Sequence, residues 1–111
     1  MDFNDYQTKA SSTNTQTEKG AQFMLMYLSM GLAGESGEVV EKLKKVVRND
    51  DGVVTDEKRE DLKKELGDVL WYLSQFADAL GISFDDVAEA NIAKLADRAK
   101  RDVIKSEGDN R

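Results

Sequence analysis

Two pairs of acidic residues have a spacing that suits the binding of a divalent cation. Glu35 and Glu38 lie three residues apart, as do Glu65 and Asp68, so on helices the members of each pair are neighbours on one face. Both pairs border apolar residues, where unpaired carboxylates repel one another and lose hydration. A hard cation with oxygen ligands would offset that cost, which predicts a site for Mg²⁺, with Mn²⁺ as the alternative.

The composition narrows the chemistry that such a site can perform. The 111 residues include no His and no Cys, which excludes zinc–thiolate sites, His-ligated metals and thiol nucleophiles. The formal net charge is −6, which argues against a DNA or RNA polymer as a partner because such binding needs a basic surface. Catalysis would therefore depend on carboxylates, basic side chains, hydroxyls and bound cations.

The acidic pairs also have a simpler interpretation. Acidic residues three apart are common on solvated helix faces, and Glu38 could pair with Lys42 one turn later. Glu41, Lys44 and Lys45 are expected to be surface residues of this kind. Both interpretations stay open here, although two such pairs, each beside an apolar stripe, favour the metal site.

A group of opposite charge follows near the end of the chain. Asn91, Lys94 and Arg98 are spaced by three and four residues, so they form one stripe on a helix. The stripe lies at nearly the same angle around the helix axis as Phe84 and Val87, which should face the core. Its cations could bind phosphate oxygens beside the metal; alternatively, they extend from the edge of the core into solvent or pair with nearby acids.

Three glycines surround the first acidic pair. Gly31, Gly34 and Gly37 recur at every third residue, and each costs a helix about 1 kcal/mol relative to Ala. Close approach of another helix or of a ligand would explain them, whereas a locally weakened helix is the alternative. The segment lacks the Gly-Lys-Ser/Thr ending of a phosphate-binding P-loop.

The elements that must position these residues are all helical. The sequence has no Pro and many Ala, Leu, Glu, Lys and Asp residues, which predicts an all-α, four-helix-bundle-like single domain over residues 1–111. The expected helices span roughly Asn4 to Ser11, Gln22 to Val47, Thr55 or Asp56 to a stop at Gly81, and Ser83 to about Ile104. Residues 11–17 should form an exposed loop, and 106–111 a frayed tail.

Apolar stripes run along the two long central helices. The second helix carries Leu25, Leu28, Leu32, Val39, Leu43 and Val46, and the third carries Leu62, Leu66, Val69, Leu73, Phe76 and Leu80. A short connection should pack these helices antiparallel, which could bring the two acidic pairs face to face. Residues 69–73 are apolar on all sides and should be covered from more than one direction.

Three segments together resemble a known enzyme family. GLAGESGE (31–38), ELGDVLWY (65–72) and NIAKLADR (91–98) are similar to the motifs of the MazG-like all-α nucleoside triphosphate pyrophosphohydrolases, whose signature is ExxE, a spacer and ExxD. The spacer here has 26 residues, which is within the family's range. The opening FNDYQ (3–7) resembles the family's short first helix, so the resemblance covers nearly the whole chain.

The resemblance implies Mg²⁺-dependent hydrolysis of a (deoxy)nucleoside triphosphate to the monophosphate and pyrophosphate. It assigns the metal to Glu35, Glu38, Glu65 and Asp68, with Glu35 or Glu38 acting on the attacking water. It assigns the phosphates to Lys94 and Arg98, with Asn91 as a further substrate contact. Family members are homodimers or homotetramers in which a neighbouring subunit helps to build the base pocket, and nucleotide-pool housekeeping is the expected role. The lack of a recognisable signal or membrane segment makes the cytoplasm the expected location.

Other assignments from the sequence are less specific. Tyr27, Trp71 and Tyr72 could stack on a base, although aromatic residues at helical spacing are more often part of a core. The acidic start and the short apolar runs predict neither a secretory signal nor a membrane span. The alternative function is a non-catalytic helical module that oligomerises or binds a protein partner.

Overall fold

The computed structural model describes residues 1–101, and the helices account for most of them. The elements are α1 (Phe3–Ser11), the short 3₁₀ helix η1 (Thr17–Lys19), α2 (Ala21–Asn49), α3 (Asp56–Ala79) and α4 (Phe84–Lys100). The all-α prediction is therefore confirmed. The expected continuation of the last helix to Ile104 and the expected tail at 106–111 lie outside the described residues. No helix in the described part is both long and apolar enough to span a bilayer.

Local side-chain caps set the helix boundaries. The carboxylates of Asp2 and Asp5 form a reciprocal capping box at the start of α1, Thr55 caps α3, and Ser83 caps α4. At the end of α3, Gly81 has a φ of +72°. The amide of Gly81 donates to the carbonyl of Asp78, and the amide after it donates to the carbonyl of Ala77, which is the Schellman arrangement.

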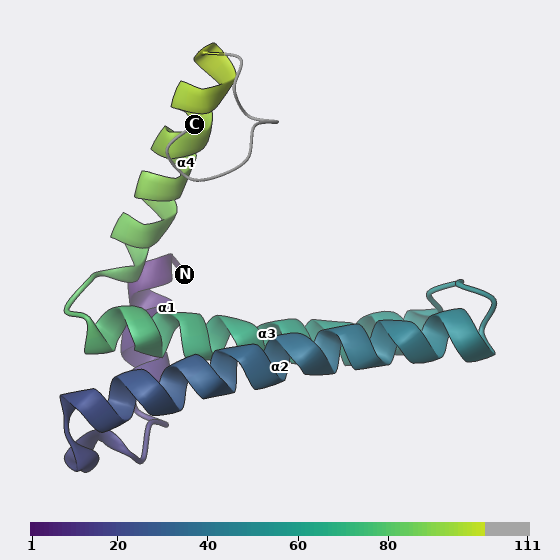
Figure 1. Ribbon diagram of the computed structural model, residues 1–111, viewed down its shortest axis with the longest axis horizontal. Helices are drawn as coiled ribbons and strands as arrows, with labels where there is room; N and C mark the ends of the chain where they lie inside the picture. Colours follow the sequence, from purple (N-terminus) through teal and green to yellow (C-terminus); the bar gives the residue numbers. More distant parts are fainter. Residues whose placement is uncertain (102–111) are drawn as a thin grey trace.

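Helices α2 and α3 form a long antiparallel hairpin, with the two helices lying side by side in Figure 1. The turn between them uses Asp51 and Gly52, both of which have positive φ values. On the inner face of α2, Met24, Leu28 and Val46 are buried. This packing fixes the register in which the side chains of α2 meet those of α3.

The apolar stripes are wider than the contact between the two helices. Leu43 of α2 remains 42% exposed, and Leu66 and Leu73 of α3 remain 57% and 40% exposed. Within residues 69–73, Leu70 lines a pocket with Tyr6 of α1, and the Tyr72 ring lies against Gly31 of α2. Leu73, by contrast, lies on a side that the described chain leaves open.

Helix α1 joins α3 to α4 through one buried side chain. The amide Nε2 of Gln7 donates to the carbonyls of Ser74 and Ile82, each at 3.1 Å. The amide of Phe84 donates to Oε1 of Gln7, also at 3.1 Å. Gln7 therefore fixes the first turn of α4 against the other two helices.

Beyond this joint, α4 projects away from the hairpin (Figure 1). It contacts α1 and α3 but not α2 within the described chain. The radius of gyration is 16.8 Å, compared with about 13 Å for a compact domain of this size. The described helices of one chain therefore do not close a four-helix bundle on themselves.

The segment after α1 is more tightly held than a freely exposed loop. The indole Nε1 of Trp71 donates to Oγ1 of Thr13 at 2.8 Å. The side-chain amide of Asn14 donates to Oε1 of Gln75 at 3.0 Å. These two bonds attach the segment to α3, which the turn-forming composition of residues 11–17 did not indicate.

Candidate metal centre

Three of the sequence-predicted acidic residues converge between α2 and α3. One carboxylate oxygen from each of Glu35, Glu65 and Asp68 lies within 4.8 Å of the other two. Glu35 is placed there because it shares the inner face of α2 with buried Leu28, seven residues before it. Glu65 and Asp68 come from one face of α3, so the antiparallel hairpin brings the two sides together. We call these three residues the acid cluster.

The surroundings of Glu35 in the acid cluster disfavour its ionised form. Burial raises the pKa of the Glu35 carboxyl above its ordinary value, and the charges of Asp68, Glu65 and Glu38 raise the pKa further. Ionisation of Glu35 is therefore opposed both by lost hydration and by like charge. An all-oxygen donor set with this excess of negative charge suits a hard divalent cation.

Glu38 does not join the acid cluster, which differs from the expected meeting of all four acids. Three residues turn a helix by about 300°, so Glu38 is rotated from the inner face of α2 towards the rim, where it is exposed. Its expected partner also differs, since Lys42 lies against Glu65 at 3.4 Å. Glu38 has no ion pair with any residue of the described range 1–101.

Aromatic residues line the same hollow as the acids. A cavity of about 350 Å³ is bounded by Glu35, Asp68, Trp71 and Tyr72. The rings of Trp71 and Tyr72 meet edge to face with their centroids 4.9 Å apart, and the centroid of the Tyr27 ring lies 6.3 Å from that of Tyr72. The structure thus gathers two candidate metal ligands and two candidate stacking residues around one opening.

Burial raises the pKa of the Tyr72 hydroxyl, and its hydrogen bond with Tyr27 raises it further. The charges of Tyr27, Glu35 and Asp68 act in the same direction. Tyr72 therefore stays a neutral phenol at the edge of an acidic site. A neutral hydroxyl can donate a hydrogen bond to an anionic ligand, which a phenolate cannot do.

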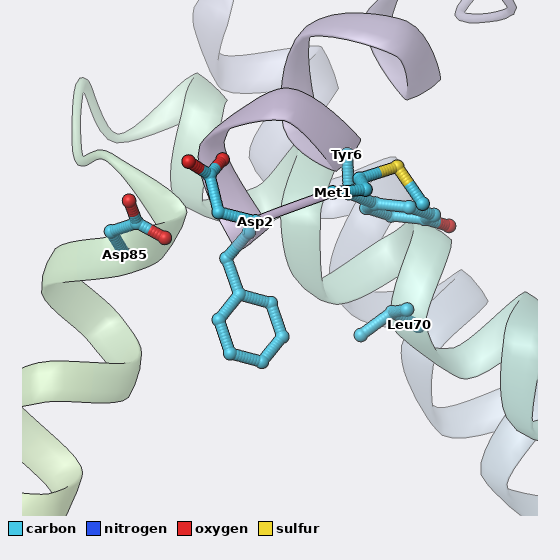
Figure 2. Close-up of a pocket in the computed structure, with 6 residues that line it drawn as sticks. Met1, Asp2, Tyr6, Leu70 and Asp85 are labelled. Atoms are coloured by element: carbon cyan, nitrogen blue, oxygen red, sulfur yellow. The ribbon is translucent and has the colours of Figure 1, made fainter.

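Tyr6 of α1 also belongs to this neighbourhood, although the sequence did not single it out. Burial, and then the charge of Asp68, raise the pKa of its hydroxyl. Tyr6 lines a pocket of about 280 Å³ together with Met1, Asp2, Phe3, Leu70 and Asp85. Figure 2 shows Asp2 and Asp85 on one side of this pocket and the Tyr6 ring beside Met1 on the other. No local spacing signal could have linked Tyr6 to Asp68.

Comparison with known proteins gives a family for this arrangement. Residues 25–103 match the model of the MazG nucleotide pyrophosphohydrolase domain. The chain belongs to the MazG family. It is also similar to the Gene 37 protein of Mycobacterium phage L5, with 49% identity over 87 residues that cover 78% of this chain and 76% of that protein. No solved structure gives a significant match.

The cations predicted for this MazG domain lie on another part of the molecule. Asn91 and Lys94 line a hollow of about 490 Å³ on α4, together with Ile82, Asp86, Val87 and Ala90. Arg98 is 4% exposed. Because α4 turns away after Gly81 and does not contact α2, the described chain does not bring these residues to the acid cluster. Their common stripe was predictable from the spacing, whereas the direction of the helix that carries it was not.

One of the three glycines on α2 is explained by packing within the MazG chain. A Cβ on Gly31 would overlap ring atoms of Tyr72, whereas no atom lies within 4 Å of a Cβ built on Gly34 or Gly37. Close approach of another helix, one of the two expected reasons, therefore applies to Gly31. Gly34 and Gly37 face open space in the described part of the chain.

The expected surface acids and bases behave as such. Nζ of Lys44 lies 3.0 Å from Glu41, and Nζ of Lys45 lies 4.0 Å from it. The hydrogen bond and charge of Lys44 hold the pKa of Glu41 below its ordinary value. Glu41 provides a matched reference for the half-buried Glu35, because both lie on α2.

Proposed function

We propose that this MazG-family protein hydrolyses (deoxy)nucleoside triphosphates to the monophosphate and pyrophosphate in a reaction that depends on Mg²⁺, or on Mn²⁺ in its place. The observation that carries the proposal is the acid cluster beside an aromatic hollow. Its carboxylates can bind cations, and an aromatic wall can take a base. The same site would serve nucleotide-pool housekeeping in the cytoplasm.

Glu35, Glu65 and Asp68 would hold the metal, with Glu38 supplying a further carboxylate from the rim. The donor chemistry fits, because every side chain in the group offers oxygen and burial raises the pKa of Glu35. A bound Mg²⁺ ion supplies charge neutralisation for the triphosphate and acidifies a bound water.

The protein side chains would position the reactants around that centre. Glu35, which lines the hollow, or Glu38, at the exposed rim one turn later on α2, would orient or deprotonate the attacking water. Trp71 and Tyr72 would receive the base, and Tyr27 would support Tyr72 from behind. Water exclusion by these rings would strengthen each electrostatic contact made with the phosphates.

Lys94 and Asn91, which are exposed on α4, would bind the phosphates after self-association into a homodimer or homotetramer. Arg98 is 4% exposed in the single chain and would join them where association uncovers its guanidinium group. Two observations support a second copy: α4 projects away from the hairpin that carries the acid cluster (Figure 1), and Leu66 and Leu73 are exposed on that hairpin. A leucine face of this kind is typical of interfaces between subunits. A neighbouring chain would then contribute basic residues that one chain holds apart from the acids.

The test is pyrophosphate release from a panel of canonical and oxidised dNTPs with Mg²⁺ or Mn²⁺. Glu35→Gln and Asp68→Asn should each lower the rate by about 100-fold or more, because each removes a carboxylate that neutralises the reacting centre through the metal. Glu41→Gln is the matched control on α2 and should keep the wild-type rate. Failure of the folded protein to hydrolyse any of these nucleotides would contradict the proposal.

Calorimetry separates this function from a non-catalytic helical module. The proposed enzyme should bind a non-hydrolysable dNTP only when Mg²⁺ is present, and Trp71→Ala should weaken that binding because a stacking surface is lost. A module that only oligomerises would show no Mg²⁺-dependent affinity. No binding to DNA or RNA is expected from a chain with a net charge of −6.

A further inference from the structure

Lys42 lies against the acid cluster rather than on the outer surface of α2. Its Nζ is 3.4 Å from Oε1 of Glu65, and the two side chains are only 33% and 16% exposed. Lys42 comes seven residues after Glu35, two turns further along the same face. The pair therefore joins α2 to α3 at a half-buried position between the two helices.

Other ion pairs of the hairpin have a different character. Lys44 pairs with Glu41, and Lys63 pairs with Glu60, in each case between exposed residues one turn apart on the same helix. Such pairs are worth little because water screens them. The Lys42–Glu65 pair is screened less, since both partners are largely covered and lie on different helices.

The choice of partner is informative, because Lys42 has a local alternative. Glu38 precedes it by four residues, the spacing that favours an ion pair on one helix. Lys42 nevertheless reaches across to Glu65, one of three carboxylates whose oxygens lie within 4.8 Å of one another. The mutual repulsion of these carboxylates makes a position beside them more favourable for a cation than the solvated rim.

We propose that Lys42 is the resident counter-ion of the acid cluster. It holds Glu65 in place when no divalent cation is bound, and it competes with that cation for the Glu65 carboxylate. The inference rests on the metal site of the proposed function, but it concerns the metal-free protein and the affinity for metal rather than the hydrolytic reaction.

The proposal has a definite thermodynamic consequence. A group that stabilises the metal-free state more than the metal-bound state lowers the affinity for the metal. Removing the charge of Lys42 should therefore destabilise the metal-free protein and, at the same time, tighten metal binding. A residue that only supported the hairpin would change the first quantity without the second.

The experiment compares Lys42→Met, which keeps most of the aliphatic stem, with Lys44→Met as the control on the same helix. Binding of Mn²⁺ is measured by the electron paramagnetic resonance signal of the free ion, and Tm is measured in chelator. Lys42→Met should bind Mn²⁺ about tenfold more tightly and lose about 5 °C in Tm without metal. Lys44→Met should match the wild type in both measurements.

The remaining outcomes each decide a separate point. Equal or weaker Mn²⁺ binding by Lys42→Met would overturn the role of Lys42, whereas no Mn²⁺ binding by the wild type would overturn the metal site itself. If Lys42→Met does not fold, the double variant Lys42→Met/Glu65→Gln provides the test. The Tm of the double variant should be close to that of Glu65→Gln, because the carboxylate that Lys42 neutralises is then absent. A Tm of the double variant well below that of Glu65→Gln would contradict the proposal.

Discussion

Glu35 occupies a position that ordinary helix patterning reserves for an apolar residue. It lies on the inner face of α2 in line with Leu28 and Val46, both of which are buried. Burial and three nearby carboxylates raise its pKa, so the metal-free fold tolerates the charge at a cost in stability. Sites that weaken a fold in this way are common where a ligand must be bound.

The first prediction follows from the sign of this pKa shift. The native pKa of Glu35 lies above the unfolded value of about 4.5, so its stabilising contribution is complete below pH 4.5 and is lost as pH rises through the native pKa. In chelator at pH 7.5, Glu35→Gln should therefore have a higher Tm than the wild type. The difference should shrink as the pH approaches 4.5.

Thermal melts with and without Mg²⁺ check this prediction. Added Mg²⁺ should raise the Tm of the wild type and leave that of Glu35→Gln nearly unchanged, since the variant lacks one candidate ligand. Glu41→Gln serves as the reference, because the pKa of Glu41 is lowered by Lys44 and its removal should not stabilise the protein. A lower Tm for Glu35→Gln in chelator would contradict the account of the acid cluster.

The sequence allowed the acids to be predicted better than their partners. The three-residue spacing and the neighbouring apolar residues indicated four acids. The hairpin brings Glu35, Glu65 and Asp68 together but leaves Glu38 at the rim. The partner of Lys42 was not predictable, because a local choice at Glu38 and a distant one at Glu65 have the same pattern. Only the register of α2 against α3 distinguishes them, and that register depends on packing along both helices.

At the scale of elements, the contact of Gly31 with Tyr72 sets how closely α2 and α3 approach beside the metal site. Gly31→Ala should cost about 1–3 kcal/mol in the free energy of unfolding, because the added methyl overlaps the Tyr72 ring. Gly34→Ala is the matched change three residues later. It meets no atom within 4 Å and should add up to about 1 kcal/mol through helix propensity.

Urea denaturation of the two variants gives the measurement, and a third variant isolates the cause. In a Tyr72→Ala background, Gly31→Ala should no longer destabilise the protein, because the overlapping ring is gone. Equal losses from Gly31→Ala in both backgrounds would show that Tyr72 is not what requires the glycine.

A second prediction at this scale concerns the joint made by Gln7. Gln7→Leu would remove the acceptor of the Phe84 amide and the donor to the carbonyls of Ser74 and Ile82. Leaving these groups without partners should cost about 3 kcal/mol. Hydrogen exchange should also become faster in the first turn of α4, while Thr8→Ala, at an exposed neighbouring position, should change neither quantity.

Element boundaries were largely predictable, whereas the direction of α4 was not. Thr55, Gly81 and Ser83 are strong local signals, and the structure uses each of them at a helix end. The direction of α4 depends on Gln7, a residue 77 positions before the Phe84 amide that it binds. No periodicity within α4 carries that information, so the expected clamp beside the acids could not be located from its stripe.

For the whole molecule, the open side of the hairpin is the dominant feature. The partly exposed residues of both helices form one apolar face: Leu25, Leu32, Val39 and Leu43 on α2, with Leu62, Leu66 and Leu73 on α3 and Leu80 at its C-terminal cap. Each row is rotated in the same sense from the residues that contact the other helix. In an antiparallel pair, this places both rows on one side, where a second hairpin can pack to complete a bundle of four helices.

The last prediction tests whether a second copy covers this face. Leu66→Lys/Leu73→Lys places two charges at its centre and should convert a self-associated protein into single chains, because charges are costly within an apolar interface. Sedimentation equilibrium measures the mass, and Thr8→Lys on α1 controls for added charge at an exposed site. A wild-type protein that sediments as a single chain at about 100 µM, roughly the upper range for weak dimers, would contradict self-association. If Lys94 and Arg98 reach the acid cluster from the second copy, the separation into single chains should abolish Mg²⁺-dependent nucleotide binding. Binding of Mn²⁺ at the acid cluster should remain intact.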